Sequence, residues 1–187
     1  MVRWYHSIFS AYGFWMPNDP RGSWSDFVAS WELFKFGPAT KTTERRSLAK
    51  DPHDVAARLL AKRALKYPPV RFTEDQRDVV GSGFARAVQE SSIVIHACCI
   101  GYDHVHVVVA RHMRAIERTV SQLKARATQA LRESAVAPDA PSPWAEGCWR
   151  VFINDDPQLR EAVSYVERHP MKEGLAPQIW SFVTPLA

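Results

Sequence analysis

Residues 103–109, Asp103-His104-Val105-His106-Val107-Val108-Val109, decide how the fold of this chain is read. The run of valines is typical of a β-strand, in which residues i and i+2 lie on one face. Both imidazoles then point one way, while Val105, Val107 and Val109 point the other. We therefore predict a central strand with possible metal ligands on one face and core on the other. A buried strand whose histidines only make hydrogen bonds is the alternative.

A second group of polar side chains follows about sixty residues later. Tyr165 and His169 are four residues apart on a predicted helix, so they lie on one helix face. If that helix packs on the sheet face that carries His104 and His106, three imidazoles and one phenol converge. Three imidazoles can hold a cation and leave positions open for water or a phosphate oxygen. Taken singly, Tyr165 suits a helix surface and His169 a helix C-terminus, so the prediction depends on their joint spacing.

Composition predicts one soluble globular domain spanning residues 1–187, with 46% hydrophobic and 24% charged residues. No apolar run approaches the roughly 18 residues of a membrane span, and the N-terminus lacks a signal-peptide core, so we expect a cytoplasmic protein without a membrane partner. Cys98, Cys99 and Cys148 are expected to be reduced, with the adjacent pair on opposite faces of a strand. The net charge of +4 favours an anionic partner only mildly.

The order of predicted elements indicates an α+β fold with one antiparallel sheet. A loop or helix insertion is expected at about residues 20–70. Strands are predicted over five segments: Arg3 to Trp15, Ile93 to Ile100, a segment that begins at His104, Cys148 to Ile153, and Ile179 to Val183. Four helices are predicted. The first runs from Asp51 to about Tyr67, and the second follows a capping box at Thr73 to Gln76. The third runs from Arg114 to Glu133, and the fourth from a cap at Asp155 to Pro170.

The predicted helix over residues 114–133 carries the densest basic region of the chain. Its outer side holds Arg114, Arg118, Lys124 and Arg126, which we treat as candidates for contacts with phosphates. An ordinary solvated face explains the same pattern equally well.

The candidate site suits phosphodiester chemistry. A cation on the imidazoles can polarise a phosphodiester, and it can favour the ionised form of a phenol, which is a poor nucleophile near a pKa of about 10. Tyr165 is then placed to attack phosphorus. Tyr102 is the rival candidate for the nucleophile, because alternation along a strand would put it on the same face as His104 and His106. The sequence lacks the motifs of acyl hydrolases, nucleotide hydrolases and zinc fingers.

These residues resemble a known family. The His104-Val105-His106 segment is similar to the histidine-hydrophobe-histidine (HUH) motif of single-tyrosine HUH transposases, and residues 165–175 resemble the tyrosine-bearing helix end of their branch called REP-associated tyrosine transposases. Residues 12–22 are similar to a stretch of part of that branch, and Lys124 resembles a helix lysine near the bound strand. The resemblance spans nearly the whole chain in family order.

The resemblance implies a ferredoxin-like (RRM-like) sheet, with the HUH motif on a central strand and the nucleophile Tyr165 on a C-terminal helix. It implies Mg²⁺ or Mn²⁺ on the two strand histidines, with His169 in the position where the family usually has Asn or Gln. Asp103 is expected to orient a ligand histidine. The implied partner is single-stranded DNA with hairpin or palindromic ends, and Arg21 is a further candidate contact with it. The protein is expected to be nucleoid-associated and to act as a monomer or homodimer.

Three competing hypotheses about the function follow from these observations. The first is a metal-dependent endonuclease and strand transferase that forms a 5′-phosphotyrosine link and a free 3′-OH. The second is a domesticated module that binds single-stranded DNA or RNA without turnover, using basic and aromatic side chains. The third is a metal-dependent phosphodiesterase that uses water in place of the tyrosine.

Overall fold

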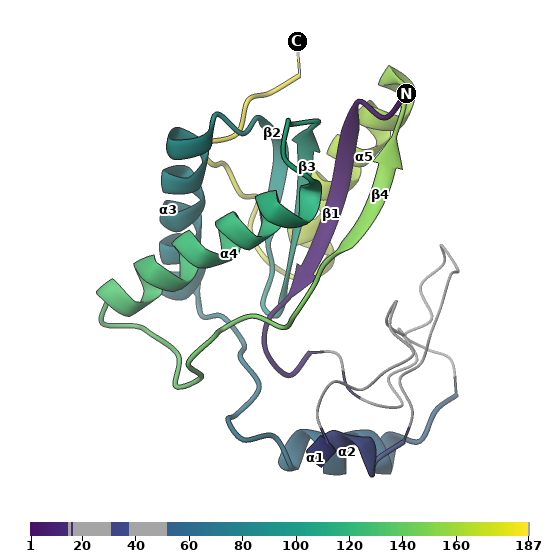
Figure 1. Cartoon of the computed structure of the whole chain (residues 1–187), viewed down its shortest axis with the longest axis vertical. Helices are drawn as coiled ribbons and strands as arrows, with labels where there is room; N and C mark the ends of the chain where they lie inside the picture. The colour runs from purple at the N-terminus through teal and green to yellow at the C-terminus, as the bar shows by residue number, and fades with distance from the viewer. Residues whose placement is uncertain (15, 17–30, 38–51, 187) are drawn as a thin grey trace.

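The computed structural model describes residues 1–14, 16, 31–37 and 52–186, and within them four strands form one antiparallel sheet in the order β2-β3-β1-β4. The strands are β1 (Trp4–Ser10), β2 (Ile95–Ile100), β3 (His104–Ala110) and β4 (Trp149–Ile153). Helices α3 (Glu74–Ser91) and α4 (Ile116–Glu133) cover one face, and α5 (Asp156–Lys172) covers the other (Figure 1). This α+β, ferredoxin-like arrangement confirms the predicted fold class.

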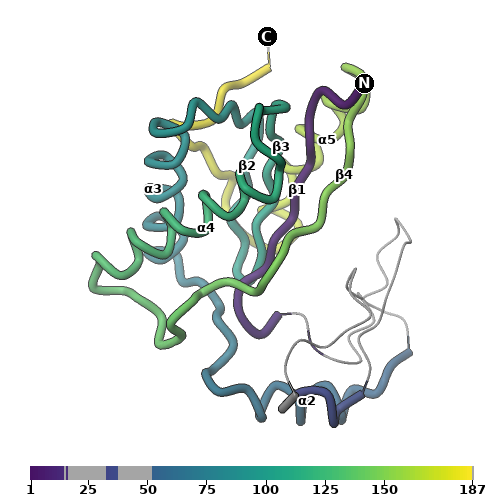
Figure 2. The backbone as a smooth tube through the Cα atoms, viewed as in Figure 1, coloured from purple at the N-terminus to yellow at the C-terminus, as the bar shows by residue number. Residues whose placement is uncertain are grey.

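Two short helices, α1 (Trp31–Phe34) and α2 (Val55–Arg63), lie beyond one end of the sheet (Figures 1 and 2). They fall within the insertion predicted at about residues 20–70, of which residues 31–37 and 52–70 are described. The predicted single domain over 1–187 and its insertion stay predictions. None of the described helices combines the length and the apolar character that crossing a bilayer requires.

Strand β3 is buried on both faces because it lies between two hydrophobic cores. Val105, Val107 and Val109 are at most 1% exposed and belong to the larger core beneath α3 and α4. Val108 belongs to the smaller core beneath α5. The adjacent cysteines divide in the same way, since Cys98 lies in the larger core and Cys99 in the smaller one, and both are free thiols as predicted.

Side-chain caps mark the starts of α3 and α5. The predicted capping box is confirmed, because the amide of Gln76 donates to the hydroxyl of Thr73 and the amide of Thr73 donates to the side chain of Gln76. Asp155 caps α5 by accepting from the amide of Gln158, also as predicted. In α4 the apolar side chains that recur at spacings of three and four are buried, namely Ile116, Val120, Leu123, Ala127 and Leu131.

Three predicted elements differ in extent from the observed structure. Helix α2 begins at Val55, where the side chain of Asp54 accepts from the amide of Ala57, and it ends at Arg63, well before Tyr67. The predicted cap Asp51 lies outside the described residues. Strand β1 ends at Ser10. The strand predicted over residues 179–183 is only one parallel bridge between Val183 and Ile95.

Pro170 was predicted to end the last helix, but α5 continues to Lys172. A proline removes one amide donor and still offers its carbonyl. The carbonyl of Pro170 accepts from the amides of Glu173 and Leu175, so the final turn stays closed. The extra residues bring Lys172 and Glu173 to the end of the helix that faces the sheet.

Candidate metal and nucleophile site

The register of the sheet sets the positions of the strand imidazoles. His104 pairs with Ser10 and His106 pairs with Ile8 on β1, and both histidines lie on the face covered by α5. His106 is buried at 4% exposure, whereas His104 lies nearer the open end of the sheet. The predicted division of β3 into an imidazole face and a valine face is confirmed.

Helix α5 brings its two predicted residues onto these imidazoles. Its buried stripe of Leu159, Val163 and Val166 packs on the sheet and fixes the rotation of the helix. The ring centroid of His169 then lies 4.1 Å from that of His106. The ring of Tyr165 lies 5.4 Å from that of His169 and 5.7 Å from that of His106. The predicted convergence of three imidazoles and one phenol is present in the fold.

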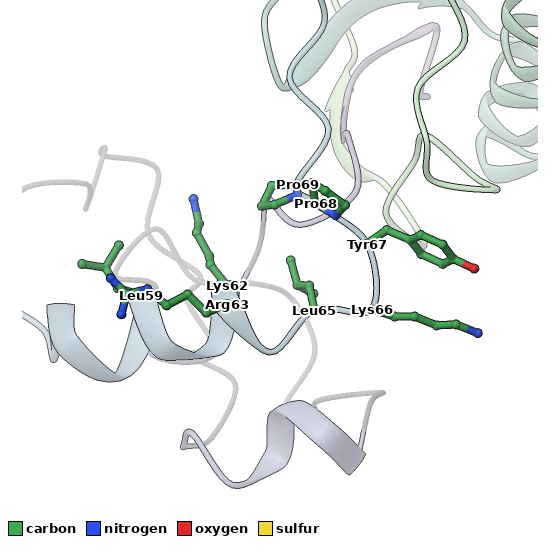
Figure 3. A pocket seen from close by; sticks show the side chains of 8 residues that line it. All are labelled: Leu59, Lys62, Arg63, Leu65, Lys66, Tyr67, Pro68 and Pro69. Atoms are coloured by element: carbon green, nitrogen blue, oxygen red, sulfur yellow. The ribbon is translucent and has the colours of Figure 1, made fainter.

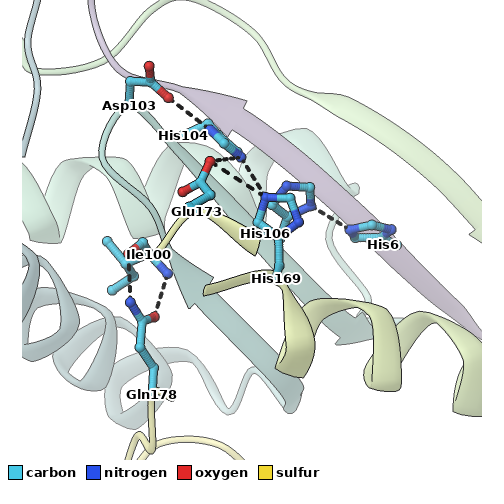
Figure 4. Close-up of polar contacts among 8 residues, drawn as sticks. All are labelled: His6, Ile100, Asp103, His104, His106, His169, Glu173 and Gln178. Atoms are coloured by element: carbon cyan, nitrogen blue, oxygen red, sulfur yellow. Dashed lines mark hydrogen bonds and ion pairs between the residues drawn. The ribbon is translucent and has the colours of Figure 1, made fainter. Parts of the chain in front are cut away.

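The three imidazoles fit a divalent cation. Each offers one nitrogen, and these nitrogens lie within 4.8 Å of one another. The Nε2 atoms of His104 and His169 are 3.0 Å apart (Figure 4). Two nitrogens bound at about 2.1 Å and at right angles to one cation would be roughly 3 Å apart, so the spacing matches a shared ion. The buried Nδ1 atom of His169 has no partner within the described parts of the chain.

Neighbouring acceptors can fix the tautomers of both strand histidines. The Nδ1 atom of His104 is 2.9 Å from Oδ1 of Asp103, so the carboxylate accepts this proton and Nε2 keeps its lone pair. The predicted role of Asp103 beside a ligand histidine is therefore consistent with its position. The Nδ1 atom of His106 is 3.0 Å from Nε2 of His6, so His6 can serve His106 as Asp103 serves His104.

His6 was missed when the sequence was read. It lies on β1, is only 9% exposed, and its ring is 5.2 Å from that of His106 and 5.8 Å from that of Tyr165. Burial, and then the charge of His169, lowers its pKa from 6.5 to about 4. The ring is therefore neutral near pH 7 and able to accept a hydrogen bond. The signal available in the sequence was the alternation of strand β1, which puts His6 at an inward-facing position.

Two of the residues that follow Pro170, Lys172 and Glu173, complete the polar surroundings of the candidate site. Lys172 places its ammonium 4.3 Å from the ring centroid of Tyr165. Glu173 places Oε1 at 3.5 Å from Nε2 of His104 and 3.8 Å from Nε2 of His169. Burial opposes ionisation of Glu173, but the two histidines lower its pKa below the ordinary value. Around the three candidate ligand imidazoles the site thus holds the carboxylates of Asp103 and Glu173, the ring of His6 and one ammonium group.

The two candidate tyrosines have different surroundings. Burial, followed by the charges of Cys99 and Glu173, raises the pKa of Tyr165, so its phenol is protonated near neutral pH. Tyr102 lies in the turn before β3, with the guanidinium of Arg71 at 4.2 Å and that of Arg77 at 5.1 Å from its ring centroid. Because Arg77 belongs to α3, the ring of Tyr102 lies away from α5. Tyr102 was predicted to share the sheet face of His104 and His106, but it lies before β3, so the alternation of the strand does not extend to it.

Helix α4, which carries the basic side chains, lies on the face of the sheet opposite to α5 (Figure 1). The amino group of Lys124 donates to the carbonyls of Ala145 and Gly147, and burial lowers its pKa to about 8. Arg126 pairs with Glu90 at 2.6 Å. These two candidates for DNA contact therefore hold other parts of the protein.

The remaining predicted contacts are placed less uniformly. Arg114 donates to the side chain of Gln122 at 2.8 Å, and Arg118 is exposed on α4. Arg21 lies outside the described residues. None of the four described candidates, Arg114, Arg118, Lys124 and Arg126, is brought to the imidazole cluster, and the binding roles of all five stay predictions.

The free energy of unfolding of the metal-free protein should decrease as the pH falls from about 6.5 to about 4. Over this interval the unfolded chain protonates its histidines while the native His6 stays neutral, so protons favour the unfolded state. The loss from His6 is on the order of 3 kcal/mol. His106 adds to it, because burial and then the neighbouring His104 lower its pKa too. Urea unfolding with a chelator at several pH values measures the slope.

His6→Gln removes the titrating group and should make this pH dependence shallower. His112→Asn, which changes a histidine outside the cluster, should leave the slope unchanged. Equal slopes for wild type and His6→Gln would contradict the assignment of this destabilisation to His6.

Comparison with known proteins gives a likeness in structure. No protein-family model matches the chain, and no curated protein matches it. Among solved structures, a REP-associated tyrosine transposase bound to a REP hairpin is similar, with a TM-score of 0.51 over 97% of this chain and 74% of that chain. The two sequences are 12% identical, so the likeness is one of fold.

Proposed function

We propose that this chain is a metal-dependent strand transferase of the REP-associated tyrosine transposase type, acting on single-stranded DNA that carries a hairpin. The observation that carries the proposal is the convergence of Tyr165 with His104, His106 and His169 within one chain. The fold shared with a transposase bound to a REP hairpin supports DNA as the partner.

His104, His106 and His169 would hold the cation, which we propose to be Mg²⁺ or Mn²⁺. When bound, such an ion polarises the scissile phosphate as a Lewis acid. An imidazole at position 169 is a softer ligand than a side-chain amide, so this chain should accept Mn²⁺, Co²⁺ or Zn²⁺ more readily than an Asn or Gln site would. Asp103 and His6 would keep the strand imidazoles in the tautomers that leave a lone pair available.

The reaction itself falls to Tyr165. Its oxygen forms a bond to phosphorus while the bond from phosphorus to the 3′ oxygen breaks, and the phenol proton ends on that oxygen. The products are a 5′-phosphotyrosine link and a free 3′-OH, which can reverse the step because the covalent bond keeps the energy. Lys172, whose ammonium lies 4.3 Å from the ring centroid of Tyr165, would stabilise the phenolate that forms during attack.

A domesticated binding module for single-stranded DNA or RNA is the second candidate. The fold shared with a protein bound to a REP hairpin supports it equally, because DNA binding by this fold requires no nucleophile. In either function we propose a cytoplasmic, nucleoid-associated protein, as a monomer or homodimer. Contacts of DNA with Arg21, Arg114, Arg118, Lys124 and Arg126 stay predictions.

The test uses a labelled hairpin oligonucleotide with a single-stranded extension, incubated with the protein and Mn²⁺. A strand transferase gives a labelled band at the size of the protein that survives denaturation and disappears when a chelator is added first. Cleavage without such a band would indicate water as the nucleophile. Binding that weakens steeply with salt, without any product in Mg²⁺, Mn²⁺ or Co²⁺, would indicate the binding module.

A further inference from the structure

A groove of about 430 Å³ lies between the end of α2 and the turn that follows it (Figure 3). Basic, aromatic and apolar side chains line it together, and it plays no part in the chemistry proposed above. Its lining includes Leu59, Lys62, Arg63, Lys66 and Tyr67.

Positive charge is concentrated at this groove. Residues 52–71 contain five Lys or Arg against one acidic residue, Asp54, and three of the five, Lys62, Arg63 and Lys66, line the groove. In the described part of the protein no carboxylate pairs with Lys62, Arg63 or Lys66, in contrast to Arg126 on α4, which is paired with Glu90. The groove therefore has cations available to an anionic partner.

Apolar surface lies beside these cations. Leu59 and Leu60 on α2 are 47% and 51% exposed, and Ala61 is the buried residue of that helix. Tyr67 lies at the groove with the ammonium of Lys66 at 5.5 Å from its ring centroid. Unpaired nucleic acid presents the matching combination of phosphates and exposed bases, whereas the bases of a duplex are stacked inside it.

A short segment connects the groove to the candidate site. The amide of Val70 donates to the carbonyl of Tyr12 at 2.9 Å. Gly13 has a positive φ of 79°, and a Cβ there would lie 2.9 Å from Pro69, so the groove packs directly against this turn. The next residue, Phe14, places its ring 5.4 Å from that of His104. Helix α2 lies beyond the end of the sheet at which β1 ends and β3 begins (Figure 1), and His104 is the first residue of β3.

We propose that this groove binds the unpaired strand next to the scissile phosphate. Lys62, Arg63 and Lys66 contact successive phosphates, and Tyr67 stacks on a base. This inference rests on the proposed function, since it names the surface that holds the single-stranded part of the same DNA. It makes the insertion a determinant of substrate choice and leaves the chemistry to the imidazoles and Tyr165.

The test compares wild type with the triple variant Lys62→Gln/Arg63→Gln/Lys66→Gln in fluorescence-anisotropy titrations over a range of salt concentrations. The probes are a hairpin with a single-stranded extension and the same hairpin without it. For the extended probe the affinity of the variant should fall about tenfold or more, and its salt slope should fall by about 2. The probe without the extension should bind both proteins equally.

The triple variant Arg3→Gln/Arg86→Gln/Arg111→Gln removes the same charge elsewhere and serves as the control, since it should keep wild-type affinity. A fall of the same size in this control, or for the probe without the extension, would overturn the proposal, because either result indicates charge or duplex binding in general. Tyr67→Leu should weaken binding of the extended probe without changing the salt slope, and unchanged affinity would remove the stacking contact.

Failure of this inference is separable from failure of the proposed function. Wild-type protein that forms the covalent adduct, together with a groove variant that binds the extended probe as tightly, refutes the groove alone. Wild-type protein that neither binds nor cleaves either probe refutes the proposed function and, with it, the groove.

Discussion

Replacing Tyr165 with phenylalanine should reduce the covalent protein–DNA adduct to background. The substitution removes the only atom of this side chain that can attack phosphorus. It keeps the ring that contacts His6, His106 and His169, and 37% exposure leaves room for the change, so folding and the imidazole cluster should be preserved. Denaturing electrophoresis of labelled oligonucleotide with Mn²⁺ measures the adduct, and mass spectrometry of the protease digest locates it.

Tyr102→Phe is the matched control and should keep the adduct, because the ring of Tyr102 lies against Arg71 and Arg77 instead of the imidazoles. An adduct that persists in Tyr165→Phe would assign the nucleophile to another residue. Cleavage that persists there without any adduct would assign the reaction to water.

Replacing His6 with phenylalanine should lower the affinity for Mn²⁺ about 10- to 100-fold, the range for loss of a hydrogen-bond partner of a metal-ligating histidine. Phenylalanine keeps a planar ring between His106 and Tyr165 but cannot accept the Nδ1 proton of His106. His106 would then populate the tautomer whose Nε2 carries a proton and cannot bind a cation. Isothermal titration calorimetry with Mn²⁺ measures this effect without any DNA.

His6→Gln offers an amide oxygen as acceptor and should restore much of the affinity, which a purely space-filling role for His6 would not produce. Circular dichroism of both variants checks that the fold is intact. Wild-type affinity in His6→Phe would contradict the assigned role and leave His6 as a core residue.

Local patterns predicted the parts of the site that depend on one element. The two-residue spacing of His104 and His106 set their common face on β3, and the four-residue spacing of Tyr165 and His169 set theirs on α5. The apolar stripe of α5 then determined which face meets the sheet. Capping by Thr73 was likewise readable, because its hydrogen bonds join residues three apart.

Features that depend on tertiary pairing were not predictable. His6 meets His106 only because β1 pairs with β3 in one register, across 100 residues of sequence. Lys172 and Glu173 were missed because Pro170 usually ends a helix, and here the following residues close one more turn. The basic stripe of α4 gave no indication of the sheet face it would cover, nor of the pairing between Arg126 and Glu90.

The phenol and the three imidazoles all come from a single polypeptide, and this sets a stoichiometry for the proposed reaction. One chain has one phenol at its cluster, so it can carry one broken strand at a time. A rearrangement in which two broken strands must be held simultaneously then needs two copies of the protein. Cutting and resealing one strand in place needs only one.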